Sequence, residues 1–255
     1  MSFEGWTRCS RTGALAGLTL TQDPSVMGRA AWTALLGEAV PVPTRGSVVG
    51  VALNGMAEWD ALAPAMSAPP YKAPPEAPVL YLKPANTWSG AFDAVTVPAS
   101  VPEVEVGATL AVVFSRDASH VRAEDAWHHF AGITLVNDLS IPTPSYYRPP
   151  VKQKCLDGFC VIGPWIAPLP AVPEALEVSV AINGEPAQTL PVAAMRRCFA
   201  QLTAAISSFM TLRAGDVLLL GLGADRPRAR AGDLITVACP GIGRQETRLV
   251  AELQP

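Results

Sequence analysis

Residues 132–166 read GITLVNDLSIPTPSYYRPPVKQKCLDGFCVIGPWI. The apolar residues 133–136 predict a buried strand that runs directly into Asp138, and a proline-rich loop with Arg148 and then Lys154 follows. A carboxylate at the end of a buried strand, followed by a lysine on a loop constrained by proline and glycine, is one way to build a metal or oxyanion site on a rigid scaffold. This stretch is therefore the first candidate for the functional site.

The composition predicts a folded chain that acts on a small molecule or on another protein. With 255 residues, 49% of them hydrophobic, the chain can bury a sizeable core. A net charge of −3 gives no electrostatic footprint for nucleic acid. We expect a small N-terminal segment over residues 1–45, closed by a Pro-Val-Pro linker, and a main domain over residues 46–255.

Cysteine usage and hydropathy predict a cytoplasmic protein. The five cysteines form no CxxC pair, and the N-terminus lacks the basic start and long apolar core of an export signal, so we expect reduced thiols. No segment approaches the roughly 20 consecutive apolar residues that a membrane span needs. No membrane partner is expected.

Hydrophobic patterning predicts many strands and few helices. Strands are expected over residues 47–53, 79–82, 110–114, 133–136, 176–182, 217–220 and 234–238. Asn183-Gly184 predicts a tight hairpin. Helices are expected near residues 25–36, in a turn near residues 59–66, over residues 125–130 with an end at Gly132, and over residues 195–209. The irregular order of these elements favours an α+β fold built on a curled sheet.

Several common catalytic motifs are missing from the sequence. It contains no GxSxG, P-loop, GxGxxG or HExxH pattern, which argues against the usual serine hydrolases, nucleotide binders and zinc proteases. Three arginines alternate at Arg226, Arg228 and Arg230, and this pattern predicts a solvated turn rather than a phosphate site.

A set of short motifs in a fixed order carries more information. They are Lys83-Pro84, Asn137-Asp138, Tyr147-Arg148-Pro149, Lys154 with Asp157-Gly158, Gly163-Pro164, and Phe209-Met210-Thr211-Leu212 with Gly215-Asp216. Together they resemble the fumarylacetoacetate hydrolase family from about residue 47 to the C-terminus. Residues 67–83 and 152–163 further resemble the N-terminal module, or stand-alone N-terminal subunit, of the branch that decarboxylates and isomerises 2-oxo diacids in homoprotocatechuate (4-hydroxyphenylacetate) degradation.

The resemblance implies a fold, a cofactor and residue roles. The fold would be a β-rich roll of mixed sheets with peripheral helices, working as a dimer. A Mg²⁺ or Mn²⁺ ion held by three carboxylates would chelate the 2-oxo acid, and such hard ions suit oxygen ligands. By resemblance, Asp138 matches the third metal ligand and Lys154 the lysine that faces the developing oxyanion. Tyr147, Arg148 and Lys83 match positions that bind substrate.

Two metal-ligand positions depart from the family pattern. The family writes Glu-x-Glu just before the strand at residues 110–114, and here Gly107 and Thr109 stand in those places. Glu103 and Glu105 form a Glu-x-Glu, but Glu105 comes two residues early, which is about 7 Å along a strand. They are weak alternative ligands, so the chain resembles a partner with an incomplete metal site. A chain that binds no metal is the alternative.

Two more departures concern the base and a turn. The family's loop histidine falls at Glu58, with Asp60 nearby, so we expect Glu58 to be the catalytic base. The family's Gly-Thr-Pro turn is Gly221-Leu222-Gly223 here, which removes a threonine hydroxyl.

The expected function is that of a subunit of a 2-oxo diacid decarboxylase/isomerase. The substrates implied by the resemblance are 5-carboxymethyl-2-oxo-hex-3-ene-1,7-dioate for decarboxylation and 2-hydroxyhepta-2,4-diene-1,7-dioate for isomerisation, with enolate stabilisation as the shared chemistry. One alternative is a catalytically degenerate scaffold that pairs with a complete sister subunit. Another is an acylpyruvate-type hydrolase. Both a homodimer and a heterodimer with the sister subunit remain open.

Overall fold

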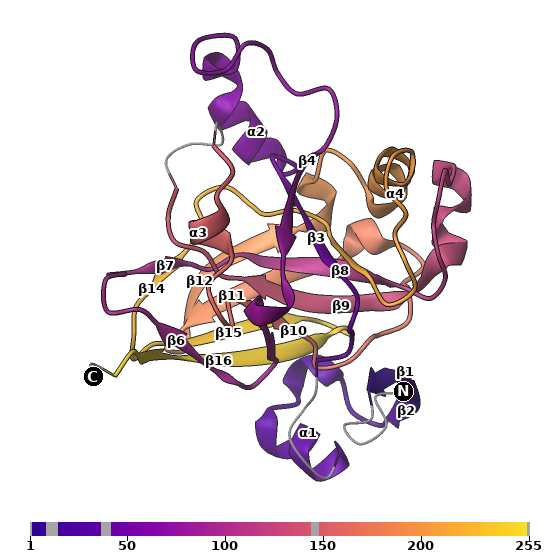
Figure 1. Cartoon of the computed structure of the whole chain (residues 1–255). Coiled ribbons are helices and arrows are strands. Elements are labelled where there is room, and N and C mark those ends of the chain that lie inside the picture. Colours follow the sequence, from indigo (N-terminus) through magenta and orange to yellow (C-terminus); the bar gives the residue numbers. More distant parts are fainter. Residues whose placement is uncertain (1, 9–14, 37–41, 144–147, 254–255) are drawn as a thin grey trace.

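The computed structural model of the chain describes residues 2–8, 15–36, 42–143 and 148–253, and two large β-sheets form its centre (Figure 1). Within these residues, the larger sheet has the spatial order β4 (Val79–Lys83), β3 (Val48–Ala52), β13 (Val217–Leu219), β8 (Ala108–Phe114), β9 (Phe130–Asp138), β10 (Cys160–Ile162) and β5 (Trp88–Gly90). The second sheet has the order β12 (Glu185–Pro191), β11 (Glu177–Ile182), β15 (Leu234–Cys239), β16 (Gly243–Ala251) and β6 (Ala94–Val97).

Smaller elements surround the two sheets. The two-stranded sheets are β1 (Phe3–Arg8) with β2 (Leu15–Leu20), and β7 (Val104–Glu105) with β14 (Arg228–Ala229). The α-helices of the described residues are α1 (Arg29–Leu36), α2 (Met56–Leu62), α3 (Val151–Lys154) and α4 (Phe199–Ser207). The 3-10 helices are η1 (Pro24–Val26), η2 (Ala63–Ala65), η3 (Ala85–Thr87), η4 (Ala123–His129), η5 (Pro173–Ala175) and η6 (Val192–Ala194).

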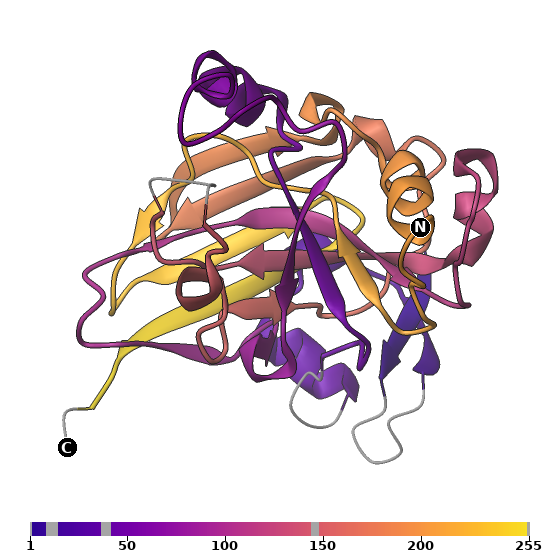
Figure 2. The ribbon, with the colours of Figure 1, turned by 45° about the horizontal axis from the view of Figure 1, so that its top comes forward.

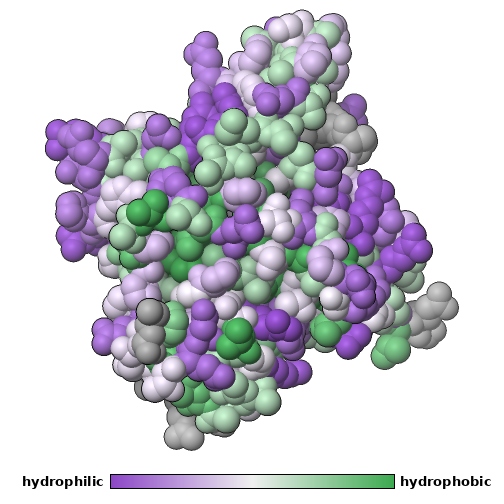
Figure 3. All heavy atoms as spheres, turned by 180° about the vertical axis from the view of Figure 1, so that it is seen from behind, coloured by the Kyte–Doolittle hydropathy of each residue, from purple (hydrophilic) through white to green (hydrophobic). Residues whose placement is uncertain are grey.

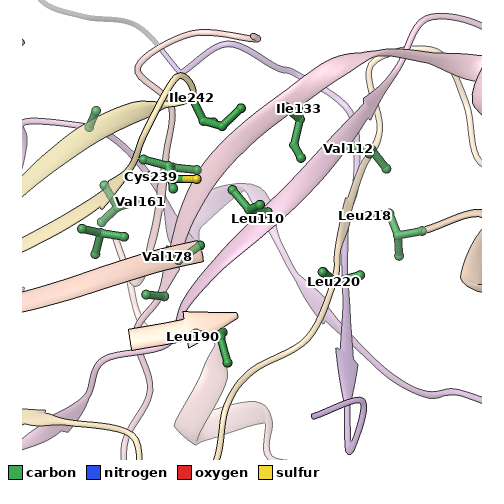
Figure 4. Packing of buried hydrophobic residues seen from close by; sticks show 14 of the residues in the cluster. Leu110, Val112, Ile133, Val161, Val178, Leu190, Leu218, Leu220, Cys239 and Ile242 are labelled. Atoms are coloured by element: carbon green, nitrogen blue, oxygen red, sulfur yellow. The ribbon is translucent and has the colours of Figure 1, made fainter. Parts of the chain in front are cut away.

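The main core lies between the two sheets. Strand β8 is buried along its whole length, as expected for a run of apolar residues in a central strand. Its Leu110 and Val112 face the second sheet, where they belong to one cluster with Val178 of β11 (Figure 4). The alternate residues Ala111 and Val113 belong to another buried cluster on the opposite face. Both faces of β8 are therefore covered.

The short connection between β4 and β5 forces the larger sheet to curl. These strands are the two edges of a seven-stranded sheet, so in a flat sheet about 29 Å would separate them. Only five Cα-to-Cα steps join Lys83 to Trp88, and these reach at most about 18 Å. The edges must therefore approach each other. Figures 1 and 2 both show β3 and β4 crossing in front of β8 and β9.

The α+β fold built on a curled sheet is confirmed, as is the hairpin. Asn183 and Gly184 join β11 to β12 with φ values of 54° and 89°, the left-handed conformations that a two-residue turn needs. Two helix predictions were wrong in extent. Gly132 lies inside β9 and ends no helix, because the preceding segment is the short η4. Helix α4 begins at Phe199 and not at residue 195, because Cys198 is an extended N-cap whose N–H donates to the Gln201 side chain.

Apolar side chains also reach the surface. Seen from behind, the rim of the molecule is mainly polar, and apolar residues lie mostly nearer the centre of this face (Figure 3). Among the helices of the described residues, none has the length and apolar character that crossing a membrane would need.

Close backbone packing at Gly132 gives a prediction about stability. A Cβ added there would lie 2.2 Å from the carbonyl oxygen of Ala167 and 2.7 Å from Ile166 Cγ2. We expect Gly132→Ala to lower the free energy of unfolding by about 1–3 kcal/mol, because this overpacking displaces backbone. Gly17→Ala is the matched control, since a Cβ at Gly17 of β2 meets nothing within 4 Å. Urea unfolding measures both, and equal stabilities of the two variants would contradict the prediction.

Candidate active site

Asp138 is the centre of the candidate site. It is the last residue of β9 and has no solvent exposure. Its Oδ1 lies 2.8 Å from Lys83 Nζ, and its Oδ2 lies 2.7 Å from Lys154 Nζ. The Tyr81 hydroxyl also donates to Oδ2, at 2.5 Å. One buried carboxylate thus forms ion pairs with two ammonium groups and accepts a hydrogen bond from a phenol.

Lys83 is anchored more completely than Lys154. Lys83 ends β4 and is 1% exposed. Besides its ion pair with Asp138, its ammonium group donates to the carbonyl oxygens of Leu139 (3.1 Å), Lys154 (2.6 Å) and Phe159 (2.8 Å). These contacts give Lys83 a supporting role, in which it fixes Asp138 and the backbone of α3. Its contact with substrate stays a prediction.

Tyr81 lies over a glycine and under a lysine. It faces Gly50 of β3, where an added Cβ would lie 2.1 Å from the Tyr81 Cζ, so only glycine leaves room for the ring. Lys154 Nζ lies 4.5 Å from the ring centroid, a cation–π contact. Burial, followed by the negative charge of Asp138, raises the pKa of Tyr81 well above its usual range. The phenol therefore stays protonated and remains a hydrogen-bond donor.

Charge balance sets the ionisation of the cluster. Burial opposes the charged form of Asp138, but Lys154 and Lys83 outweigh it and hold the pKa of this carboxyl well below its usual range. Burial lowers the pKa of Lys154, and the positive charges of Lys83 and Arg226 act in the same direction, against the attraction of Asp138. Lys83 and Lys154 share the single carboxylate of Asp138, so these three side chains together carry one net positive charge.

A second ion-pair group, formed by Arg226, Glu58 and Glu105, lies beside the first. Arg226 Nη1 donates to Glu58 Oε1 at 2.8 Å, and Nε donates to Glu105 Oε2 at 2.9 Å. Its side chain is only 13% exposed. The prediction of a solvated turn was therefore wrong for Arg226, because two carboxylates draw it inward. It holds better for Arg228 and Arg230, whose side chains are 56% and 75% exposed.

Different elements position the two glutamates. Glu58 lies in the first turn of α2, and its Oε2 accepts a hydrogen bond from the Leu53 N–H at 2.9 Å. Glu105 ends β7, and its backbone exchanges hydrogen bonds with Ser140, two residues beyond Asp138. Glu105 is thus fixed to the end of β9, while Glu58 approaches from a separate seven-residue helix.

Two cavities meet at this ion-pair group. An open outer cavity of about 550 Å³ is lined by Glu58, Ala61, Leu62, Glu105, Ala224, Asp225, Arg226 and Arg228. An inner cavity of about 30 Å³ is lined by Ala52, Glu58, Tyr81, Glu105, Ser140, Thr143, Pro150, Lys154, Leu222 and Arg226. Glu58, Glu105 and Arg226 line both cavities. The inner cavity reaches Lys154, and the outer one has room for a small diacid.

The other predicted site residues are dispersed. Tyr147 lies outside the described residues, and Arg148 is exposed. Glu103 pairs with Arg228 and Arg230, away from Asp138. The structure thus brings together Asp138, Lys154 and Lys83, places Glu58 and Glu105 around Arg226, and leaves Glu103 and Arg148 elsewhere.

The positions of the two family glutamates offer no room for a metal site. Gly107 is packed so closely that an added Cβ would lie 2.3 Å from the Asp138 carbonyl oxygen. The Thr109 hydroxyl is turned away and donates to the Gly221 carbonyl at 2.6 Å. Within the described part of the chain, no three His, Cys, Asp or Glu side chains gather in a way that could hold a metal ion. The donor set around Asp138 consists of cations and hydrogen-bond donors.

Tyr81 and Arg226 were missed from the sequence. Tyr81 had a usable signal, because it lies two residues before Lys83 on a predicted strand and so points to the same face. Arg226 had none, since its partners lie 168 and 121 residues away in the chain and only the fold brings them together.

The buried ion pairs give a prediction with a definite pH dependence. We expect Asp138→Asn to lower the free energy of unfolding at pH 7 by roughly 3–5 kcal/mol, because it leaves two buried lysines without a counter-ion. The pKa of Asp138 in the folded state is below its unfolded value of about 3.9, so this stabilisation is present above about pH 4. This stabilisation is lost as the pH falls through the pKa of Asp138 in the folded state. The difference in unfolding free energy between wild type and Asp138→Asn should become smaller there.

Urea unfolding at a series of pH values measures this effect. Asp60→Asn, at an exposed position on α2, is the control and should change the unfolding free energy by less than about 0.5 kcal/mol. A difference in unfolding free energy between Asp138→Asn and wild type that is small at pH 7, or that grows toward low pH, would contradict the role of Asp138 as the counter-ion of the two lysines.

Comparisons with known proteins show which family this sequence and fold resemble. The chain is 40% identical over 208 residues to the 4-hydroxyphenylacetate degradation bifunctional isomerase/decarboxylase of Escherichia coli, which covers 82% of this chain and 48% of that protein. The chain thus spans about half the length of the curated relatives it matches.

Solved structures match the whole fold. The 5-carboxymethyl-2-hydroxymuconate delta-isomerase of Mycobacterium smegmatis superposes with a TM-score of 0.77, at 25% identity and with 100% of both chains covered. The fumarylpyruvate hydrolase of Pseudomonas aeruginosa, solved with Mn²⁺ and pyruvate, has a TM-score of 0.69 at 20% identity, with 83% of this chain and 91% of that chain covered, and so shares the fold. The family model for the C-terminal region of fumarylacetoacetate (FAA) hydrolase matches residues 47–250, and the chain belongs to the fumarylacetoacetate hydrolase family.

Proposed function

We propose that the chain is a subunit of a 2-oxo diacid decarboxylase/isomerase that stabilises an enolate. The observation that carries this proposal is the Lys154 ammonium group, held by Asp138 and the Tyr81 ring at the wall of the inner cavity. The substrates proposed are 5-carboxymethyl-2-oxo-hex-3-ene-1,7-dioate and 2-hydroxyhepta-2,4-diene-1,7-dioate. The relatives named for isomerase and decarboxylase activity support this substrate class.

One enolate serves both half-reactions. In decarboxylation the bond to the departing carboxylate breaks, CO₂ leaves, and the electron pair moves toward the 2-oxo oxygen. In isomerisation a proton leaves one carbon and returns to another, with the same oxygen carrying the charge between the two steps. Lys154 would donate to that oxygen, and Glu58 is the proposed base. A preorganised donor of this kind is worth roughly 3–4 kcal/mol in the transition state.

A divalent metal ion does not fit this arrangement. Asp138 already has Lys83 at one oxygen and Lys154 and Tyr81 at the other, and Gly107 and Thr109 supply no carboxylate. Glu105 is bound to Arg226 instead of lying free as a substitute ligand. The fumarylpyruvate hydrolase of similar fold was solved with Mn²⁺, but the side chains around Asp138 in this chain do not form a ligand set for such an ion, and no step is assigned to a metal ion here.

A second candidate function is a scaffold that pairs with a complete sister subunit. The loss of carboxylates at positions 107 and 109 favours it, because the chain would then shape a partner's site instead of doing chemistry. Activity of the purified chain with the 2-oxo diacid separates the two candidates. An inert chain that gains activity only after a sister chain with an intact Glu-x-Glu co-purifies would favour the scaffold.

The role of Lys154 leads to a prediction about turnover. We expect Lys154→Ala to lower kcat for decarboxylation by at least about 100-fold, because the oxyanion loses its donor. Lys152→Ala is the matched control, since Lys152 is exposed on the same helix α3. The release of CO₂ and the dienolate absorbance measure the effect, with urea unfolding to verify the fold. Unchanged turnover in Lys154→Ala would remove this residue from the mechanism.

The donor set also leads to a prediction about metal binding. We expect the purified chain to bind neither Mg²⁺ nor Mn²⁺ stoichiometrically, because two ammonium groups next to Asp138 repel a divalent cation. Titration calorimetry after dialysis against EDTA is the measurement. One-to-one binding with a micromolar Kd would defeat this expectation.

A further inference from the structure

We propose that Arg226 is the carboxylate-binding residue of this site, and that a substrate carboxylate takes the place of Glu58 on its guanidinium group. In the structure Arg226 binds Glu58 and Glu105 side by side. Arginine presents several N–H donors in a planar fork that matches a carboxylate. The proposal rests on the proposed function only for the class of substrate, an organic dianion.

The cavities explain why this exchange is needed. The inner cavity of about 30 Å³ has room for about two water molecules, which is too small for a diacid. The outer cavity is large enough, but Glu58, Glu105 and Arg226 form a wall that it shares with the inner one. A substrate that reaches Lys154 from the outer cavity must therefore displace part of this ion-pair group.

Charge balance makes an anion the right molecule to do so. The two adjoining ion-pair groups contain three cations (Lys83, Lys154 and Arg226) and three carboxylates (Asp138, Glu58 and Glu105). When a substrate carboxylate replaces that of Glu58, the buried charges stay balanced. A neutral molecule in the same place would leave Arg226 with one buried counter-ion fewer, which is strongly unfavourable. The exchange therefore selects for anions.

Glu58, and not Glu105, is the carboxylate that leaves. Glu105 ends a strand whose backbone is hydrogen-bonded to Ser140 on one side and pairs with Arg228 of β14 on the other. Glu58 belongs to α2, which lies outside both sheets (Figure 1). Its departure breaks side-chain contacts and no strand pairing. It also frees the carboxylate of the proposed base at the moment the substrate arrives.

Calorimetric titration in EDTA tests the exchange, with oxalate as the dianionic probe and oxamide as its neutral counterpart. Wild type should bind oxalate and not oxamide. Arg226→Gln should weaken oxalate binding by at least about tenfold, because one charge-assisted contact is lost, and Arg226→Lys should recover part of it. Arg230→Gln is the matched control, because its side chain is 75% exposed and pairs with Glu103, and it should bind as wild type does.

Glu58→Gln gives a result of opposite sign. Removing the competing carboxylate should tighten oxalate binding, by about threefold or more, because a neutral amide leaves Arg226 more easily than a carboxylate does. A purely structural role for the ion pair predicts weaker binding in both Glu58→Gln and Arg226→Gln. Urea unfolding verifies that both variants fold. Weaker or unchanged binding in folded Glu58→Gln, or full binding in Arg226→Gln, would overturn the proposal.

A separate measurement distinguishes a failure of the proposed function from a failure of the anion exchange. NMR in D₂O follows the exchange of protons next to the 2-oxo group, which reports enolate formation and depends on Lys154. Exchange without Arg226-dependent oxalate binding would reject the anion exchange and leave the enolate chemistry standing. Arg226-dependent binding of oxalate without proton exchange would support the anion exchange and reject the enolate chemistry.

Discussion

The buried carboxylate of Asp138 holds the ammonium groups of two buried lysines, which would otherwise repel each other. Because Lys83 also binds three backbone carbonyls, this one ion pair joins the end of β4 to the ends of β9 and α3. The position of Lys154 at the inner cavity follows from that junction. The tight packing of Tyr81 on Gly50 completes it, since the phenol bonds to the same carboxylate.

The site is therefore organised by cations where other members of the family are expected to use a metal ion. The backbone leaves no room for glutamate side chains at the two positions. Gly107 packs against the Asp138 carbonyl, and the Thr109 hydroxyl donates to the Gly221 carbonyl. Restoring two glutamates at these positions would not recreate three converging ligands without moving strand β8 relative to β9. Around Asp138 two ammonium groups share one carboxylate, and the adjoining Arg226, which is paired with Glu58 and Glu105, lies in the wall of the outer cavity.

Much of the fold and part of the site could be predicted from the sequence. Apolar runs identified β3, β8 and β9, which are buried along nearly their whole length, and also the partly buried β4 and β15. Asp138 and Lys154 were predicted because both lie in one continuous stretch with family-like spacing. Arg226 was assigned to solvent, since its two carboxylate partners come from distant segments and no local pattern records them. The helix limits near residues 132 and 195 failed because β9 begins directly after helix η4 at Phe130, and because an extended N-cap residue precedes Phe199, neither of which periodicity registers.

The four residues that join β4 to β5 also affect the site, through the length of the connection that they form. Loops are usually where insertions accumulate, since a longer loop adds little entropy cost. Here the short connection keeps the two edges of the curled sheet close together, and a longer one would remove this constraint and leave only the hydrogen bonds and strand pairing of Lys83 to hold it beside Asp138. A surface segment with no catalytic side chain of its own thus supports the geometry of the site through its length alone.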